Sequence, residues 1–85
     1  MPLIKLYGTR FCPYCVRARF LLKKKQVEFE DLPVGSGGIS WAELEEMTGR
    51  DTVPQIYIDE THVGGYDDLA ALNRSGELDK LLGLV

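Results

Sequence analysis

The chain has 85 residues, of which 45% are hydrophobic and 27% are charged, the composition of an ordinary globular protein. Its length predicts one domain over residues 1–85. The formal net charge of −3, with both signs intermixed, argues against nucleic acid as the main partner. No apolar run approaches a membrane span, and Met1 leads directly into a strand-like segment, so we expect no membrane anchor and no signal peptide.

The first part of the chain predicts a strand, a helix and a second strand. Residues 3–7 are apolar apart from an interrupting lysine, which predicts a strand. Residues 13–25 carry apolar side chains at helical spacing. The lysines at 23–25 suit a last helical turn, because they complement its dipole, better than a nucleic-acid patch. Residues 27–32 alternate with period two, so the three segments predict a parallel, right-handed crossover.

A glycine-rich loop and a second helix follow. Residues 33–38 predict a loop, but not a phosphate-binding loop, because the Lys-Ser/Thr pair of that motif is missing. Ser40 is the predicted N-cap, Glu43 its capping-box partner, and Gly49 the residue that ends the helix. Three residues spaced three apart are expected to face the core: Trp41, Leu44 and Met47.

The last part of the chain predicts a hairpin and two helices. Residues 55–58 predict a third strand, residues 59–62 a turn, and Val63 the start of a short fourth strand that must pair antiparallel with the third. His62 is therefore expected near an exposed hairpin tip. It is not expected to act as a base, because the helix at residues 13–25 belongs at the other end of the third strand. Two helices are predicted after the hairpin, over residues 67–72 and 76–82.

The two cysteines of the chain, Cys12 and Cys15, have the spacing of a thioredoxin-like redox site. Pro13 suits the first turn of a helix, which places Cys12 at the helix N-terminus. There the free N–H groups and the helix dipole favour the thiolate, which is the nucleophilic form. We therefore expect Cys12 to attack and the more buried Cys15 to resolve.

A Cys-X-X-Cys pair can also serve in a zinc site or as an inert disulfide. A structural zinc site usually needs four ligands, mostly Cys and His. The chain offers only Cys12, Cys15 and His62, so a carboxylate would have to supply the fourth. An inert disulfide across so short a loop would stabilise little. Redox chemistry in a reducing compartment is the better interpretation.

Three blocks of the chain resemble the glutaredoxin family: Cys12-Pro13-Tyr14-Cys15, Thr52-Val53-Pro54 and Gly64-Gly65-Tyr66-Asp67-Asp68. Their order and spacing over residues 4–82 are similar to those of dithiol glutaredoxins, the small bacterial ones in particular. The resemblance implies an α/β, thioredoxin-like fold in which helices flank a four-stranded mixed β-sheet. It also implies glutathione as co-substrate, with no tightly bound cofactor and no metal.

The resemblance implies a backbone platform beside the redox motif. In the family the proline equivalent to Pro54 is cis, and a cis X-Pro bond is uncommon and usually purposeful. Here it would turn the Val53 backbone toward the Cys12 sulfur, next to Thr52. An incoming peptide could then pair with Val53 as an added strand.

The resemblance also implies how glutathione is held. A helix that opens near Gly65 and Tyr66 can hold one carboxylate on its free N–H groups. By analogy with the family, Asp68 pairs with the ammonium group, and Asp67 supplies its backbone N–H and its own carboxylate. Both aspartates also suit a helix start on their own. Relatives often carry a cysteine where this chain has Tyr66.

The glycine-end carboxylate of glutathione needs a cation, and the candidates are Arg50 and Arg10. Many relatives carry Lys three residues before the first cysteine, where this chain has Thr9. Arg10 can bind this carboxylate in place of that lysine only if its loop turns the side chain inward. Tyr14 is expected to flank the mixed disulfide.

The expected function is glutathione-dependent reduction of glutathione mixed disulfides and protein disulfides, with roles in electron transport and cell redox homeostasis. We expect a cytoplasmic monomer whose partners are glutathione and disulfide-bonded proteins. Two alternatives stay open. One is a dimer that shares an iron–sulfur cluster, which Pro13 disfavours because cluster-holding relatives usually have a smaller residue there. The other is a thioredoxin-type reductase fed by a flavoenzyme, which Tyr66, Asp67 and Asp68 disfavour.

Overall fold

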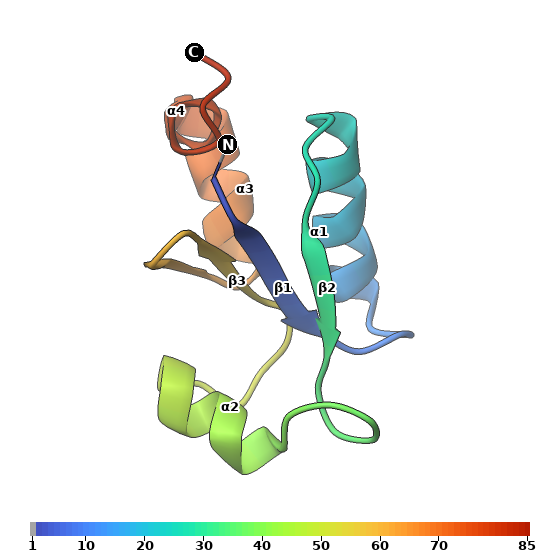
Figure 1. Cartoon of the computed structure of the whole chain (residues 1–85). Coiled ribbons are helices and arrows are strands. Elements are labelled where there is room, and N and C mark those ends of the chain that lie inside the picture. The colour runs from blue at the N-terminus through green and yellow to red at the C-terminus, as the bar shows by residue number, and fades with distance from the viewer. Residues whose placement is uncertain (1) are drawn as a thin grey trace.

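The computed structural model describes residues 2–85, in which four strands and four helices follow one another along the chain (Figure 1). Their bounds are β1 (Ile4–Gly8), α1 (Pro13–Lys24), β2 (Glu30–Pro33), α2 (Trp41–Thr48), β3 (Gln55–Ile58), β4 (Thr61–Gly64), α3 (Tyr66–Ser75) and α4 (Glu77–Leu81).

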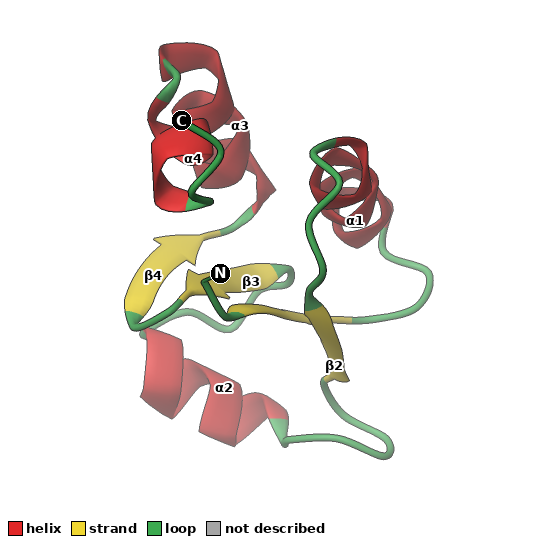
Figure 2. Cartoon of the chain, turned by 45° about the horizontal axis from the view of Figure 1, so that its top comes forward, coloured by secondary structure: helices red, strands yellow, loops and turns green. Residues whose placement is uncertain are grey.

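The strands form one mixed sheet in the order β2-β1-β3-β4. β1 pairs with β2 in parallel and with β3 antiparallel, and β4 pairs antiparallel with β3. This arrangement confirms the predicted crossover and hairpin. Figure 2 shows that α1, α3 and α4 cover one face of the sheet, whereas α2 lies on the other.

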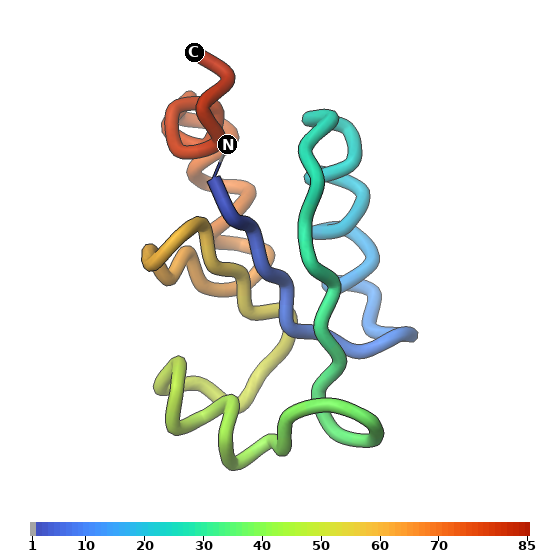
Figure 3. Tube along the Cα trace, viewed as in Figure 1, coloured from blue at the N-terminus to red at the C-terminus, as the bar shows by residue number. Residues whose placement is uncertain are grey.

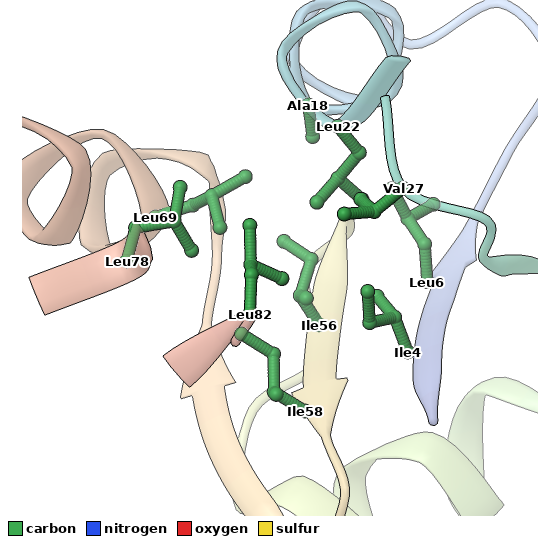
Figure 4. Close-up of a cluster of buried hydrophobic side chains, with 10 residues drawn as sticks. All are labelled: Ile4, Leu6, Ala18, Leu22, Val27, Ile56, Ile58, Leu69, Leu78 and Leu82. Carbon is green, nitrogen blue, oxygen red and sulfur yellow. The ribbon is translucent and has the colours of Figure 1, made fainter. Parts of the chain in front are cut away.

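The main core lies between the sheet and the three helices that cover one of its faces, α1, α3 and α4 (Figure 4). Its members are almost entirely aliphatic: Ile4, Leu6, Ala18, Leu22, Val27, Ile56, Ile58, Leu69, Leu78 and Leu82. The chain trace in Figure 3 brings the two ends of the molecule together, and Pro2 lies beside Gly83. The core therefore joins the first strand to the last helix, and this fixes how α1 and α3 lie on the sheet.

The second helix is capped as predicted but buries less than predicted. The Ser40 hydroxyl accepts the N–H of Glu43 at 3.0 Å, and Gly49 ends the helix in a left-handed conformation with φ of 76°. Leu44 is fully buried, but Trp41 and Met47 are 43% and 45% exposed, so their predicted place in the core is wrong. Because α2 covers its face of the sheet alone, it buries only a narrow stripe.

The second strand is shorter than predicted. Pairing with β1 begins only at Glu30, so residues 27–29 are not part of the sheet. The chain leaving α1 is held by the helix instead: the N–H of Val27 is bonded to the Leu22 carbonyl at 3.5 Å, and the Val27 side chain is buried in the core. It joins the sheet only at Glu30.

The predicted position of His62 at an exposed hairpin tip is also wrong. The turn contains only Asp59 and Glu60, and β4 begins at Thr61. His62 lies within β4, opposite Tyr57, and its half-buried ring stacks on the tyrosine with 4.9 Å between the ring centroids. The His62 ring therefore points toward Gln55, the first residue of β3. The third and fourth helices are found where predicted, with α3 three residues longer at its C-terminal end.

Candidate active site

Two free cysteines lie where β1 leads into α1. Cys12 is the N-cap residue, with extended backbone, and Pro13 occupies the first helical position. The Cys12 side chain is partly exposed, whereas Cys15 is fully buried. The geometry therefore offers one accessible sulfur at a helix N-terminus and one sulfur behind it, as the spacing predicted.

The buried sulfur of Cys15 is packed against Gly8, the last residue of β1. A Cβ at Gly8 would lie 2.9 Å from the Cys15 sulfur and 3.3 Å from the guanidinium group of Arg19, so only glycine permits this approach. Arg19 donates to the Thr9 carbonyl at 2.9 Å and to the Asp31 carboxylate at 2.8 Å. These contacts hold a cation beside the cysteine pair.

The surroundings move the pKa values of the two thiols in opposite directions. Burial would raise the pKa of Cys12, but N–H groups of Cys15 and Tyr14, the Cys15 thiol and the charge of Arg19 together outweigh it and lower that pKa. The sulfur makes no full N-cap hydrogen bond, so the effect comes from several weaker contacts. Burial, followed by the neighbouring Cys12 sulfur, raises the pKa of Cys15. At neutral pH the accessible sulfur is thus the better source of thiolate.

A loop that precedes β3 faces Cys12. The Val53-Pro54 peptide bond is cis, as the resemblance implied. The Cys12 thiol lies 3.9 Å from the Val53 carbonyl oxygen, a long S–H···O contact between residues 41 positions apart. The backbone edge of Val53 is therefore placed next to the accessible sulfur.

The side chain of Gln55 anchors this loop. It is fully buried, and its amide nitrogen donates to the Thr52 carbonyl at 3.0 Å and to the Thr52 hydroxyl at 3.3 Å. Its amide oxygen lies 2.7 Å from Nε2 of His62, so the neutral imidazole must carry its proton on Nε2. Burial and the nearby Arg50 lower the pKa of His62, which favours this neutral form. One amide thus links the loop to β4.

A charged pair lies at the start of α3. The Asp68 carboxylate accepts the N–H of Gly65 at 3.0 Å and pairs with the Arg50 guanidinium at 2.8 Å. The hydrogen bond from Arg50, then the one from Gly65, lowers the pKa of Asp68, so the carboxylate is ionised at neutral pH. Gly64, with φ of 112°, makes room for it, because a Cβ there would collide with the carboxylate. Arg50 and Asp68 were expected to serve two different ligand groups, and in the structure they face each other.

These segments enclose a pocket of about 180 Å³ at the end of the sheet where α1 and α3 both begin (Figure 1). Its lining consists of Tyr14, Arg50, Thr52, Val53, Pro54, Gly65, Tyr66, Asp67 and Asp68. The rings of Tyr14 and Tyr66 lie 6.3 Å apart, centroid to centroid, and form one wall. The structure thus brings together every residue predicted to hold glutathione except Arg10.

Arg10 lies elsewhere. Its guanidinium group is 5.6 Å from the centroid of the Phe11 ring, and its side chain lines a different hollow of about 530 Å³ that includes Thr9, Arg19 and Asp31. This hollow is larger than the pocket beside Val53, but its lining does not include Val53, whose carbonyl oxygen lies 3.9 Å from the Cys12 sulfur. The smaller pocket, which includes Val53, is therefore the better candidate site.

Sequence reasoning missed four supporting residues: Gln55 and His62, which hold the loop of the pocket, and Gly8 and Arg19, which lie near the Cys15 sulfur. The only available signal was a glutamine between Pro54 and the apolar residues of a strand. Within residues 2–85 no three His, Cys, Asp or Glu side chains gather as metal ligands would. Among the same residues, no helix has both the length and the apolar character needed to cross a bilayer.

Comparison with known proteins gives consistent matches over nearly the whole chain. The family model described as Glutaredoxin matches residues 4–63. The chain is 51% identical to a glutaredoxin of Pseudomonas aeruginosa over 82 residues, which cover 96% of this chain and 98% of that protein. It is 47% identical to glutaredoxin 3 of Escherichia coli K12 over 79 residues, which cover 93% of this chain and 95% of that protein.

Solved structures agree with the sequence matches. The solution structure of a glutaredoxin from Brucella melitensis has a TM-score of 0.84 and 45% identity, covering 96% of this chain and 89% of that one. The crystal structure of a buckwheat glutaredoxin–glutathione complex has a TM-score of 0.87 and 25% identity, covering 96% and 77%. With its mixed sheet, its Cys-Pro-Tyr-Cys motif at a helix start and these relatives, the chain belongs to the glutaredoxin family of thiol–disulfide oxidoreductases.

Proposed function

We propose that this protein reduces glutathione mixed disulfides and protein disulfides with glutathione as the reductant, through Cys12 and Cys15. The observation that carries the proposal is the pocket beside Cys12, which combines a backbone edge, a cation, an anion and a helix N-terminus. Glutathione offers an amide backbone, two carboxylates and an ammonium group. Each of these groups has a partner of opposite character in the pocket.

In this proposal the glutathione backbone pairs with Val53, whose loop is held by Gln55. The carboxylate at the glycine end binds Arg50, and the ammonium group binds Asp68. The other carboxylate binds free N–H groups at the start of α3, near Asp67. Tyr14, Thr52, Pro54, Gly65 and Tyr66 complete the walls. Arg10, which lines the other hollow, is left out of this set.

The pairing of Arg50 with Asp68 in the free protein fits this role. Their side chains are 48% and 43% exposed, and an exposed ion pair contributes only about 0–1 kcal/mol. Hydrogen bonds to charged groups are worth about 1.5–3 kcal/mol each when the site excludes water. A zwitterionic ligand gives each residue a new partner of opposite charge, so the pair can open for glutathione at small cost.

The chemistry follows from the two thiols. The Cys12 thiolate attacks the glutathionyl sulfur, a Cys12–glutathione disulfide forms, and the substrate leaves as a thiolate that takes a proton from solvent. A second glutathione thiolate then attacks this mixed disulfide, which gives glutathione disulfide and restores Cys12. With a protein disulfide, Cys15 loses its proton and attacks the protein–Cys12 adduct, and glutathione later reduces the Cys12–Cys15 disulfide. The raised pKa of Cys15 keeps it protonated until then.

The proposed reaction has two kinds of partner, glutathione and a disulfide-bonded protein. Glutathione is a co-substrate, and no tightly bound cofactor takes part in these steps. The second partner is any glutathionylated or disulfide-bonded protein that can reach Cys12. Reduced glutathione is abundant in reducing compartments such as the cytoplasm, so we propose that the protein works there, as a monomer.

The division of labour between the cysteines tests the proposal. Cys12→Ser should abolish all activity, because the chain has no other accessible thiol. Cys15→Ser should keep or increase activity on a small glutathione mixed disulfide, but lose most activity on a protein disulfide, with glutathione as the reductant in both assays. Loss of both activities in Cys15→Ser would mean that glutathione is not the resolving partner.

The thiolate of Cys12 should form at an unusually low pH. Its lowered pKa means that, in a Cys15→Ser background, the alkylation rate rises with pH and reaches half its maximum below the ordinary midpoint for a thiol. Adding Arg19→Gln should move the midpoint upward, because it removes a nearby positive charge. A midpoint at the ordinary thiol value in both proteins would contradict the helix-terminus argument.

Arg50 and Asp68 should act on binding. Arg50→Ala and Asp68→Ala should each raise KM for a glutathionylated substrate by about tenfold with little change in kcat, because they remove contacts present in ground and transition states alike. The effect of Arg50→Ala should shrink at high salt, since that side chain is exposed. Arg10→Ala is the matched control and should leave KM unchanged. If KM in all three variants equals that of the unmodified protein, Arg50 and Asp68 do not bind the substrate.

Gln55 should act as a positioning residue. Gln55→Leu fills the buried space but removes the bonds to Thr52 and His62, so we expect a higher KM for the glutathionylated substrate. The Cys12 titration midpoint should not move, because the amide does not touch that sulfur. A normal KM in this variant would show that the Gln55 amide does not position Val53.

A further inference from the structure

The outward side of α1 carries apolar residues that the core does not use. While α1 buries Cys15, Ala18 and Leu22, Val16 and Phe20 are 52% and 69% exposed. Exposed apolar residues scattered singly are normal in soluble proteins. These two are four positions apart, so they are neighbours on one side of the helix.

A shallow hollow of about 350 Å³ lies beside these two side chains and reaches α3. Its lining consists of Val16, Arg17, Phe20, Leu21, Lys24 and Tyr66. We call Val16, Arg17, Phe20 and Lys24 the outer face of α1. A contiguous apolar area with a charged rim is the usual mark of an interaction site.

The charge of this helix differs from that of the whole chain. Residues 13–24 contain four cations and no acidic residue, whereas the chain as a whole carries 10 Lys and Arg against 13 Asp and Glu. Lys24 complements the end of the helix dipole, but Arg17 lies mid-helix and has no such reason. Neither forms an ion pair with any of residues 2–85, although the Arg17 guanidinium lies 5.4 Å from the centroid of the Tyr14 ring. Both cations are therefore free to meet carboxylates of a partner.

The outer face is continuous with the pocket beside Cys12. Tyr66 lines both hollows, and Tyr14, which Arg17 covers, forms the pocket wall together with Tyr66. A polypeptide whose disulfide reaches Cys12 can thus extend over the two tyrosines onto α1. A second copy of this chain is a poor occupant, because a two-fold contact would bring Arg17 and Lys24 of both copies together.

We propose that the outer face of α1 binds the segment next to the disulfide of a protein substrate, and that it selects segments with a large apolar side chain beside carboxylates. The apolar side chain packs on Val16 and Phe20, and the carboxylates pair with Arg17 and Lys24. The inference rests on the disulfide reduction proposed above, since it names the partner of the same site. It does not require glutathione to be the reductant.

The test compares disulfide-bonded peptides that differ only beside the disulfide, where they carry Leu-Glu-Glu, Leu-Lys-Lys or Gly-Glu-Glu. Each is mixed with pre-reduced protein in a single turnover at low salt, without glutathione. The Leu-Glu-Glu peptide should react about fivefold faster than the Leu-Lys-Lys peptide, and the ratio should fall at about 1 M salt, where charges are screened within roughly 3 Å. The Gly-Glu-Glu peptide should lie between them.

A matched pair of variants identifies the surface. In Phe20→Gln/Lys24→Glu the three peptides should react at similar rates. Met47→Gln/Arg74→Glu makes the same changes at an exposed apolar residue of α2, across the sheet, and at a cation in the last turn of α3, and should keep the preference. Both variants should reduce a small glutathione mixed disulfide as fast as the unmodified protein, which shows that they are folded and active.

Two results would overturn the inference: an unchanged peptide preference in Phe20→Gln/Lys24→Glu, or an equal loss in the control variant, which would point to net charge alone. Failure of the proposed function looks different. In that case the unmodified protein reacts with the peptides in a single turnover, yet does not turn over the small mixed disulfide with glutathione.

Discussion

The candidate site depends on one buried amide. Gln55 has no solvent exposure, so its donors and acceptor must find partners inside the protein, and it finds them in Thr52 and His62. These bonds tie the loop that contains the cis peptide bond to the last strand of the sheet. Val53 is thereby held next to Cys12. Because β4 ends at Gly64, the start of α3 lies beside the same pocket. An apolar residue at position 55 would fill the core equally well but would leave the loop untied.

The electrostatics of the site are arranged in two layers. Near the sulfurs, a helix N-terminus and Arg19 stabilise negative charge on Cys12, while burial opposes it on Cys15. Farther out, Arg50 and Asp68 neutralise each other in an exposed ion pair. In the proposed function the inner layer determines which thiol reacts, and the outer layer binds glutathione.

Helix α1 has a buried side that packs in the core and an exposed side that carries apolar and basic residues. Its inner side supplies Ala18 and Leu22 to the core, and its N-terminus holds the redox pair. Its outer side is basic and partly apolar within an acidic protein. Because α1 begins directly after Cys12 and Tyr66 lines both hollows, the outer side adjoins the candidate site, and the inference drawn above links the two.

The sequence by itself determined the features that depend on neighbouring residues. Helix starts at Pro13 and Ser40, the stop at Gly49 and the bounds of β3 were all predicted correctly, because caps, proline and apolar period act within a few residues. The motif blocks indicated the family and eight of the nine residues that line the pocket, and the ninth, Arg50, was predicted from the need for a cation.

Only the tertiary structure decided what depends on residues far apart in the chain. Residues 27–29 stay out of the sheet although their pattern alternates, and Val27 is buried in a core that contains residues from both ends of the chain, Ile4 and Leu82. Arg50 pairs with Asp68 across 18 positions, and Arg10 turns to a separate hollow although it lies next to the redox motif. His62 could be placed only once β4 was seen to begin at Thr61, which points its ring at Gln55. Such contacts depend on which backbone groups and side chains remain unpaired after the sheet forms, and no local pattern in the sequence records that.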